Sequence, residues 1–276
     1  MDKEEWSYGI IMKVRTLIIA SLLCQLSIIS YGQNNYELPE YYGQSPIFHL
    51  GYSLLYDEDN NIPIWVAWEL NKGKLPEVKI SRHSRFKPDP ELGTQALNHD
   101  DYTNSGYDRG HMCPARDCCE NGQSMLESFY MSNVCPQKPE LNRKVWGKIE
   151  DKCDTWALNY FDKLYICCGP IMDGQGTFFF SQFGNRIWAP YRFFKVVVAK
   201  DRNGSFIGTG FIMNQEGHAI MTTIDYIESI IGIDLFHSFP YRIEKKIESR
   251  RPSYQDWPEL KETVPGLKDQ KGNPIN

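Results

Sequence analysis

The segment Tyr107-Asp108-Arg109-Gly110-His111 places an imidazole two residues after a guanidinium group. Histidine exchanges its proton near neutral pH, so it is the natural side chain for a general base. Arginine can bind two oxygens of one phosphate through paired hydrogen bonds. The glycine between them gives the backbone conformational freedom. This residue pattern is suited to acid–base chemistry beside a phosphate group.

A predicted helix further along the chain carries Asn142, Trp146 and Glu150. An amide oxygen such as that of Asn142 is a hard, neutral ligand that suits Mg²⁺, which keeps most of its waters. On a straight helix, Asn142 and Glu150 would be separated by a rise of about 12 Å and a rotation of about 80°. One small cation therefore does not bind both side chains directly. We expect Glu150 to act through a water on the metal, or by orienting Arg109 or Asn142.

The helix itself is predicted from the period of the apolar residues between Leu141 and Phe161. Pro139 lies just upstream, where prolines favour the start of a helix. Spacings of four and three mark one helical face. The residues on that face are Val145, Ile149, Cys153, Trp156 and Tyr160.

Elsewhere, aromatic and β-branched residues predict strands. The segments 48–56 and 62–70 flank an Asp/Asn-rich turn and predict a β-hairpin. A second helix is predicted over Thr222–Ile231 and ends at Gly232. Further strand candidates are 128–134, 164–168, 178–180, 193–199 and 206–213. Strands and helices mix without a regular β-α-β alternation, which predicts the α+β class.

Taken together, these segments resemble the DNA/RNA non-specific endonucleases, the ββα-metal or His-Me finger nucleases that include mitochondrial endonuclease G. The resemblance runs from about residue 51 to about residue 240. It rests on Trp65–Trp68, Phe86–Pro90, Asp101-Tyr102, Ser105–His111, Phe129–Gln137, and Leu141-Asn142 with Trp146, Ile149 and Glu150. It implies an α+β fold, with a mixed or antiparallel sheet core and a ββα-metal (His-Me) finger.

The resemblance also implies a role for each catalytic candidate. His111 looks like the general base that activates a water, and Asn142 like the one direct protein ligand of Mg²⁺, for which Mn²⁺ could substitute. Arg109 looks like a clamp on the phosphate and the transition state. Glu150 looks like the carboxylate that holds the waters around the metal.

Three further residues are substrate-binding candidates. A family arginine comes from the basic loop before Phe86, where Arg82 and Arg85 compete for the role. Asn133 looks like a support for the site. Asp108 is expected to brace its loop rather than touch the substrate.

Two positions depart from the family pattern. Lys144 stands where family members often carry glycine, and Asp154 stands where they often carry arginine, one turn after Glu150. The second change removes a positive charge near the substrate. We expect it to weaken phosphate binding without abolishing catalysis.

The implied function is a Mg²⁺-dependent, sugar-non-specific endonuclease. It would hydrolyse phosphodiester bonds in DNA and RNA to 5′-phosphate and 3′-hydroxyl ends, alone or as a homodimer. The formal net charge of −5 excludes a globally basic protein that coats nucleic acid. One alternative is a non-catalytic module on the same fold that binds nucleic acid. Another is a zinc-stabilised domain using His111, Cys113, Cys118 and Cys119, although the paired C-x₂-C spacing of structural zinc sites is missing.

Residues 1–32 are predicted to be a signal peptide with an N-terminal extension. Lys13 and Arg15 precede the apolar run Thr16–Ser30, and small residues lie before Gln33. This predicts a secreted or periplasmic protein that is not held in a membrane. The endonuclease domain is assigned to residues 33–245, and a polar surface tail to residues 246–276. Without Cys24, the remaining cysteines are odd in number, and some are expected to pair in an oxidising compartment.

Overall fold

The structure is a computed structural model that describes residues 35–75 and 80–275. The chain divides into Met1–Tyr36 and Glu37–Asn276, and the account below concerns the second unit. The predicted signal peptide lies outside the described residues. Among the helices of the described part, none combines the length and apolar character needed to cross a membrane.

An antiparallel sheet of seven strands forms the centre of this unit, in the order β1-β2-β3-β6-β9-β10-β11. The strands are β1 (Ile47–Phe48), β2 (Ser53–Asp57), β3 (Ile62–Leu70), β6 (Lys163–Pro170), β9 (Arg192–Lys200), β10 (Phe206–Asn214) and β11 (Ala219–Thr222). Strands β2 and β3 pair as the predicted hairpin. The predicted α+β class is confirmed.

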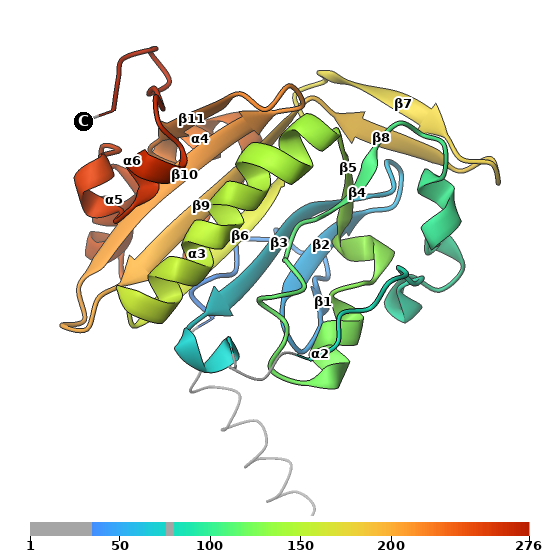
Figure 1. The fold of residues 1–276 in the computed structure, drawn as a ribbon, viewed down its shortest axis with the longest axis horizontal. Helices are drawn as coiled ribbons and strands as arrows, with labels where there is room; N and C mark the ends of the chain where they lie inside the picture. The colour runs from blue at the N-terminus through green and yellow to red at the C-terminus, as the bar shows by residue number, and fades with distance from the viewer. Residues whose placement is uncertain (1–34, 76–79, 276) are drawn as a thin grey trace, which may run out of the picture. The chain divides into compact units, whose positions relative to one another are not determined.

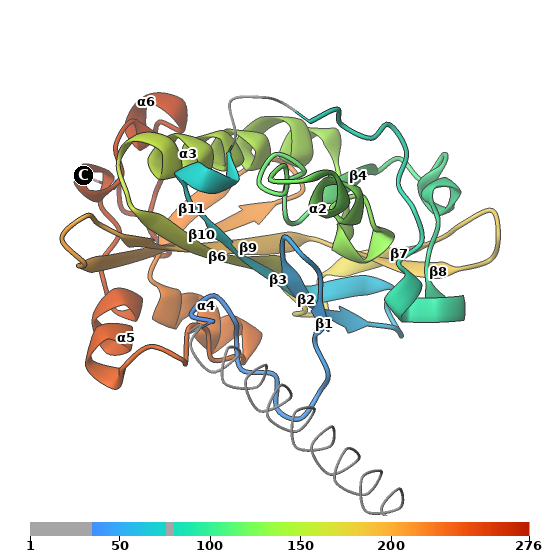
Figure 2. The same ribbon diagram turned by 90° about the horizontal axis from the view of Figure 1, so that it is seen from below.

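Helices cover both faces of the sheet. Figure 2 shows α3 (Gly147–Asn159) on one face, and α4 (Ile224–Ile231) with α5 (Tyr241–Glu248) on the other. Strands β6 and β9 are therefore buried along almost their whole length, and their sequences are apolar nearly throughout. In β10, a side chain at Gly208 would lie 2.8 Å from the backbone oxygen of Ile247, so glycine is required for α5 to approach.

Both predicted helices are confirmed. The first begins as a π-helical turn over Leu141–Trp146 and continues as α3, with Trp146, Ile149 and Trp156 fully buried. Helix α4 begins after Thr223, whose hydroxyl accepts the N–H of Tyr226, and ends at Gly232 with φ 70°. Two short helices, α2 (Gly122–Glu127) and α6 (Leu260–Thr263), complete the α-helical elements of the described chain.

A small two-stranded sheet precedes the helix that carries Asn142. Strand β4 (Asp108–His111) pairs antiparallel with β5 (Val134–Gln137), and the π-turn and α3 follow directly. In Figure 1, β4 and β5 lie beside the end of α3, which gives the ββα arrangement. The predicted strand 128–134 is wrong. A 3₁₀ turn occupies Met131–Asn133, because the side chains of this segment bond to nearby backbone instead of leaving it free to pair.

The structure adds strands that the sequence analysis missed. Strand β7 (Gly176–Phe180) contains the predicted 178–180 segment and pairs with β8 (Arg186–Pro190) as a separate hairpin. Neither β8, β11 nor β4 was predicted. Each is only four or five residues long, which leaves little periodicity to detect.

The prediction of a surface tail over residues 246–276 is wrong for its apolar residues. Trp257 is 1% exposed, and its ring centroid lies 4.7 Å from that of Trp156 on α3. Leu260 and Leu267 also join the main core. These side chains are scattered among polar ones without a helical or strand period, so the sequence pattern did not reveal their burial.

Candidate active site

A cavity of about 390 Å³ opens where β4, the loop after it and the start of the long helix meet. It brings together five of the predicted site residues: Arg82, Arg109, His111, Asn142 and Glu150. Other side chains in its wall are Phe86, Pro114, Ala115, Arg116, Asp117, Asp151 and Asp154. The cavity wall thus combines basic and acidic side chains that are far apart in the sequence.

His111 lies at the end of β4 with its ring between two aromatic side chains. Its ring centroid is 4.7 Å from that of Phe86 and 5.0 Å from that of Phe129. Its Nε2 atom is buried and has no hydrogen-bond partner among the described residues. Burial, and then the charge of Arg82, lower the pKa of His111 to about 3. The imidazole is therefore neutral at pH 7, as a general base must be.

Asn142 is held by Asp108. The amide Nδ2 donates to Asp108 Oδ2 at 3.0 Å, and Arg143 donates to both oxygens of the same carboxylate. No described residue donates to Asn142 Oδ1. The side chain does not cap the helix, because Glu140 occupies the N-cap position. The orientation leaves a neutral oxygen ligand available at the cavity.

Glu150 lies about two turns further along the helix than Asn142, and its carboxylate contacts two neighbouring side chains. Its Oε1 accepts the indole N–H of Trp146 at 2.7 Å, and Lys195 Nζ lies 3.6 Å away. Burial raises the pKa of Glu150 to about 7, although the Lys195 charge and the Trp146 hydrogen bond oppose that change. The carboxylate is poised to change charge near neutral pH.

Lys195 is a site residue that the sequence analysis missed. Its side chain is fully buried in β9, and its Nζ lies 4.2 Å from the ring centroid of Trp146. The available signal was a single lysine within the apolar strand RFFKVVVAK, because a buried lysine almost always has a partner. The apolar pattern predicted a strand over residues 193–199, and it gave no indication of what Lys195 contacts.

Arg116 supplies the charge that Asp154 was expected to remove. Its Nε donates to Asp154 Oδ2 at 2.7 Å, and its side chain is 58% exposed at the cavity wall. The positive charge comes from the loop after β4 instead of from α3. A guanidinium is thus present beside Asp154, on another element, and the effect of Asp154 on phosphate binding stays a prediction.

The two competing arginines of the basic loop separate clearly. Arg82 lines the cavity and lies over the ring of Phe129, with 5.5 Å from its Cζ to the ring centroid. Arg85 is absent from the cavity wall and forms an ion pair with Asp100. The geometry favours Arg82 as the residue that contacts phosphate.

Asn133 supports the site and does not contact substrate. It is fully buried, its Oδ1 accepts the N–H of Cys113 at 2.9 Å, and its Nδ2 donates to the carbonyls of Cys113 and Ser128. Every polar group of the side chain is used. Its complete burial argues against the predicted substrate contact and agrees with the expected supporting role, because it fixes the backbone that follows His111.

The cysteines differ from expectation. All seven in the described chain are buried free thiols, with Cys113 Sγ and Cys118 Sγ 3.3 Å apart. In the described part, the groups of three or more His, Cys, Asp or Glu side chains close enough to share a cation are carboxylates on α4, α5 and the loop between them, and they include neither His111 nor a cysteine. The zinc-domain alternative is therefore not supported.

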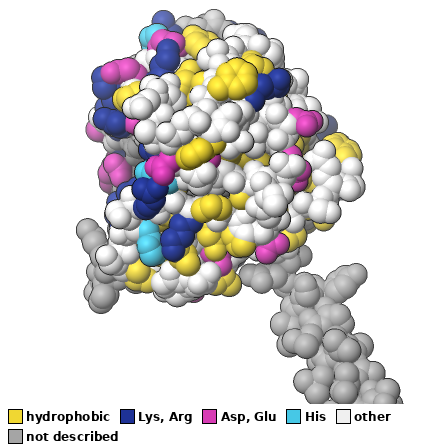
Figure 3. All heavy atoms as spheres, turned by 90° about the vertical axis from the view of Figure 1, so that its right-hand side faces the viewer, with side chains coloured by type: hydrophobic (Ala, Val, Ile, Leu, Met, Phe, Trp, Pro, Cys, Tyr) yellow, Lys and Arg dark blue, Asp and Glu magenta, His cyan; other side chains and the backbone are white. Residues whose placement is uncertain are grey.

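Acidic and basic groups also mix on the outer surface. Figure 3 shows a face of the molecule where lysine and arginine side chains stand beside acidic side chains and histidines along one flank. This mixture agrees with the acidic net charge. Three arginines, Arg82, Arg109 and Arg116, lie in the cavity wall.

Comparison with known proteins gives the class to which this fold and cavity belong. The family model described as DNA/RNA non-specific endonuclease matches residues 32–242. A Nostoc sp. protein named nuclease is 31% identical over 215 residues, which cover 72% of this chain and 76% of that protein. The mitochondrial nuclease EXOG of Danio rerio is 32% identical over 184 residues, which cover 63% of this chain and 53% of that protein.

A solved structure has the same fold. The crystal structure of the EndoG/EndoGI complex superposes with a TM-score of 0.66 at 23% identity, covering 78% of this chain and 94% of that one. The chain thus spans about three quarters of the Nostoc nuclease and about half of the Danio rerio nuclease. The chain belongs to the DNA/RNA non-specific endonuclease family, and it is an enzyme of the nuclease class.

Proposed function

We propose that the protein is a Mg²⁺-dependent endonuclease that hydrolyses DNA and RNA to 5′-phosphate and 3′-hydroxyl ends. The observation that carries the proposal is the shared cavity, whose wall contains neutral His111 and Asn142 together with Arg82, Arg109 and Arg116. Family membership supports the same reaction class.

The residues present fit a hard divalent cation. Asn142 offers an uncharged oxygen, and Glu150 adds a carboxylate in the same cavity wall. Such oxygen donors suit Mg²⁺, with Mn²⁺ as a substitute. When bound, the cation would stabilise the negative charge that develops on the phosphate and on the departing oxygen.

The chain's own residues account for the other parts of the reaction. Neutral His111 accepts a proton from the attacking water. Arg82, Arg109 and Arg116 bind phosphate oxygens and stabilise charge in the transition state. Arg109 is held for this by donating to the carbonyl of His99 at 2.8 Å. Contacts with phosphate carry no base information, so low sequence preference and activity on both sugars follow.

The test of this proposal is digestion of supercoiled plasmid in Mg²⁺ and in EDTA, followed by treatment of the nicked product with DNA ligase. We expect nicking in Mg²⁺ alone, and nicks that ligase seals, because sealing requires a 5′-phosphate and a 3′-hydroxyl. A protein that shifts plasmid mobility without nicking it would instead be the non-catalytic binding module. Nicks that ligase cannot seal would contradict the proposed ends.

Export and self-association are also parts of the proposal. The predicted signal peptide implies that the mature protein begins near Gln33 and is secreted or periplasmic. Sequencing the N-terminus of protein recovered outside the cytoplasm tests the first point. Light scattering of the purified protein tests whether it forms a homodimer.

Replacement of the cavity arginines should raise KM for DNA, because each removes a phosphate contact. We expect Arg82→Ala and Arg116→Ala to raise KM about 10-fold each, as for loss of a charge-assisted hydrogen bond worth about 1.5 kcal/mol. Arg85→Ala is the matched control from the same loop, and its KM should remain at the wild-type value. An equal loss in all three variants would refute the assignment of Arg82 over Arg85.

The activity should rise with pH through the ionisation of Glu150. Its raised pKa of about 7 means that the carboxylate is protonated below that pH and charged above it. We expect kcat/KM to increase as pH rises through about 7, whereas His111, with a pKa of about 3, stays neutral across this range. Glu150→Gln should lose about 10- to 100-fold in activity and lose this limb of the profile. If Glu150→Gln keeps the rise in kcat/KM near pH 7, that rise belongs to the ionisation of another group.

A further inference from the structure

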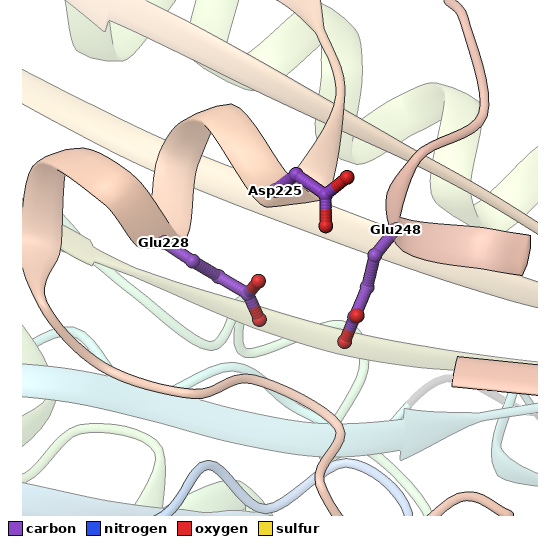
Figure 4. A group of neighbouring side chains, drawn as sticks. All are labelled: Asp225, Glu228 and Glu248. Atoms are coloured by element: carbon purple, nitrogen blue, oxygen red, sulfur yellow. The ribbon is translucent and has the colours of Figure 1, made fainter. Parts of the chain in front are cut away.

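A second cluster of ionisable side chains lies across the sheet from α3, on the helices of the opposite face. Asp225 and Glu228 share one side of α4, and Glu248 is the last residue of α5. One carboxylate oxygen from each of the three lies within 4.8 Å of the others. Figure 4 shows the three carboxylates converging on the space between the helices.

Apolar packing holds these carboxylates together. Ile224, Ile227 and Ile247 are essentially fully buried. Gly208 and Gly210 on β10 let both helices sit close to the sheet, since a side chain at Gly210 would lie 2.3 Å from Ile227 Cδ1. The apolar faces of the helices fix their positions, and this packing brings the acidic side chains close together.

Glu248 is the residue that most requires a partner. It is 8% exposed, points into the cluster in Figure 4, and its Oε1 has no hydrogen-bond partner in the described chain. Glu228 uses only its Oε1, which accepts the N–H of Leu235 at 2.8 Å. A buried carboxylate without a partner is costly unless a cation or a proton neutralises it.

The surroundings add negative charge. Asp234 and Glu244 form a second such group with Glu248, so five carboxylates meet here. Of the described lysines and arginines, none is ion-paired with any of the five, and the basic group near Asp234 and Glu244 is His237. Burial, with the neighbouring carboxylates, raises the pKa of Glu228 to about 7 and that of Glu248 to about 8. Near neutral pH a proton or a bound cation is therefore needed to neutralise Glu228 and Glu248.

We propose that Asp225, Glu228 and Glu248 bind one Ca²⁺ ion that ties α4 to α5. Ca²⁺ binds carboxylate oxygens at about 2.3–2.6 Å, so two ligands on one ion lie within about 5 Å of each other, as these oxygens do. The oxygen-only ligand set disfavours soft metals, and Ca²⁺ accepts more variable geometry than Mg²⁺, which demands a near-ideal octahedron. The site is separate from the cavity of His111 and does not depend on the nuclease reaction.

The test is the melting temperature of the full chain in EDTA and in increasing CaCl₂. A ligand at 100 times its Kd should raise Tm by about 5 °C or more in a domain of this size. The shift should persist in Asn142→Ala, which removes the proposed metal ligand of the nuclease cavity. It should also persist in the matched control Glu262→Gln, an exposed glutamate on α6. It should disappear in Glu248→Gln, which lacks one of the three carboxylate ligands.

Isothermal titration of the Asn142→Ala protein with Ca²⁺ keeps the proposal testable if Glu248→Gln folds poorly. One bound ion is expected there, and Asp225→Asn should weaken its binding about 10-fold or more. The proposal is overturned if Ca²⁺ leaves the wild-type Tm unchanged, or if Glu248→Gln keeps the full shift. It is also overturned if Asn142→Ala abolishes the shift, or if Mg²⁺ at the same concentration stabilises Asn142→Ala equally.

Discussion

His111→Ala should lower kcat for DNA cleavage by at least about 10²–10⁴-fold, the usual contribution of one general base. The loss should appear in kcat and leave substrate affinity near the wild-type value, because the neutral imidazole adds no charge to phosphate binding. The position of His111 in the cavity wall supports this expectation, as does its pKa of about 3, which keeps the imidazole neutral. Single-turnover cleavage of plasmid measures the effect.

His218→Ala provides the matched control. His218 is exposed in the turn between β10 and β11, and it is not part of the cavity wall. Its replacement should leave kcat unchanged. Circular dichroism should show both variants folded. A kcat of His111→Ala within a few-fold of the wild-type value would show that His111 is not the general base.

Asn142→Ala should have the second large effect, which falls on the response to metal. Removing the proposed direct ligand should raise the Mg²⁺ concentration required for half-maximal activity by about 100-fold or more, at least the upper end of the 10- to 100-fold range for residues that only support metal ligands. The reason is that Oδ1 is the side-chain oxygen that Asp108 orients by holding the amide nitrogen. A Mg²⁺ titration of cleavage rate at fixed DNA concentration measures it.

Two further variants test whether loss of the amide oxygen causes the raised Mg²⁺ requirement. Asn142→Asp retains a ligand oxygen and should recover much of the Mg²⁺ affinity. Asp108→Asn should weaken the Mg²⁺ response less than Asn142→Ala, since it disturbs only the orientation of the amide and the pairing with Arg143. An unchanged Mg²⁺ requirement in Asn142→Ala would show that the cation binds elsewhere in the cavity.

Much of the site could be predicted from the sequence because its principal residues sit in local patterns. The helical period placed Asn142 and Glu150 on one helix, and the structure confirms that helix. In the structure no described residue donates to Asn142 Oδ1, whereas Glu150 contacts Trp146 and Lys195, and the division of metal roles between the two residues stays a prediction. Periodicity and residue chemistry involve residues that are close in the sequence, so they can be recognised without the tertiary structure.

The rest depends on contacts between segments far apart in the chain. Lys195 reaches Glu150 only because β9 passes beneath α3, and Arg116 meets Asp154 only after the loop following β4 folds over the helix. Burial of Trp257 likewise needs α3 as its partner. No periodicity within any of these segments encodes such pairings, so they emerge only with the tertiary structure.

The measurement that tests the central claim most directly is digestion of supercoiled DNA and of RNA by wild type and His111→Ala, side by side in the same Mg²⁺ buffer. We predict that wild type degrades both nucleic acids and that the variant loses at least about 100-fold on each, because one base serves both sugars. Equal cleavage of DNA or RNA by the two proteins would contradict a single active site built around His111 and Asn142.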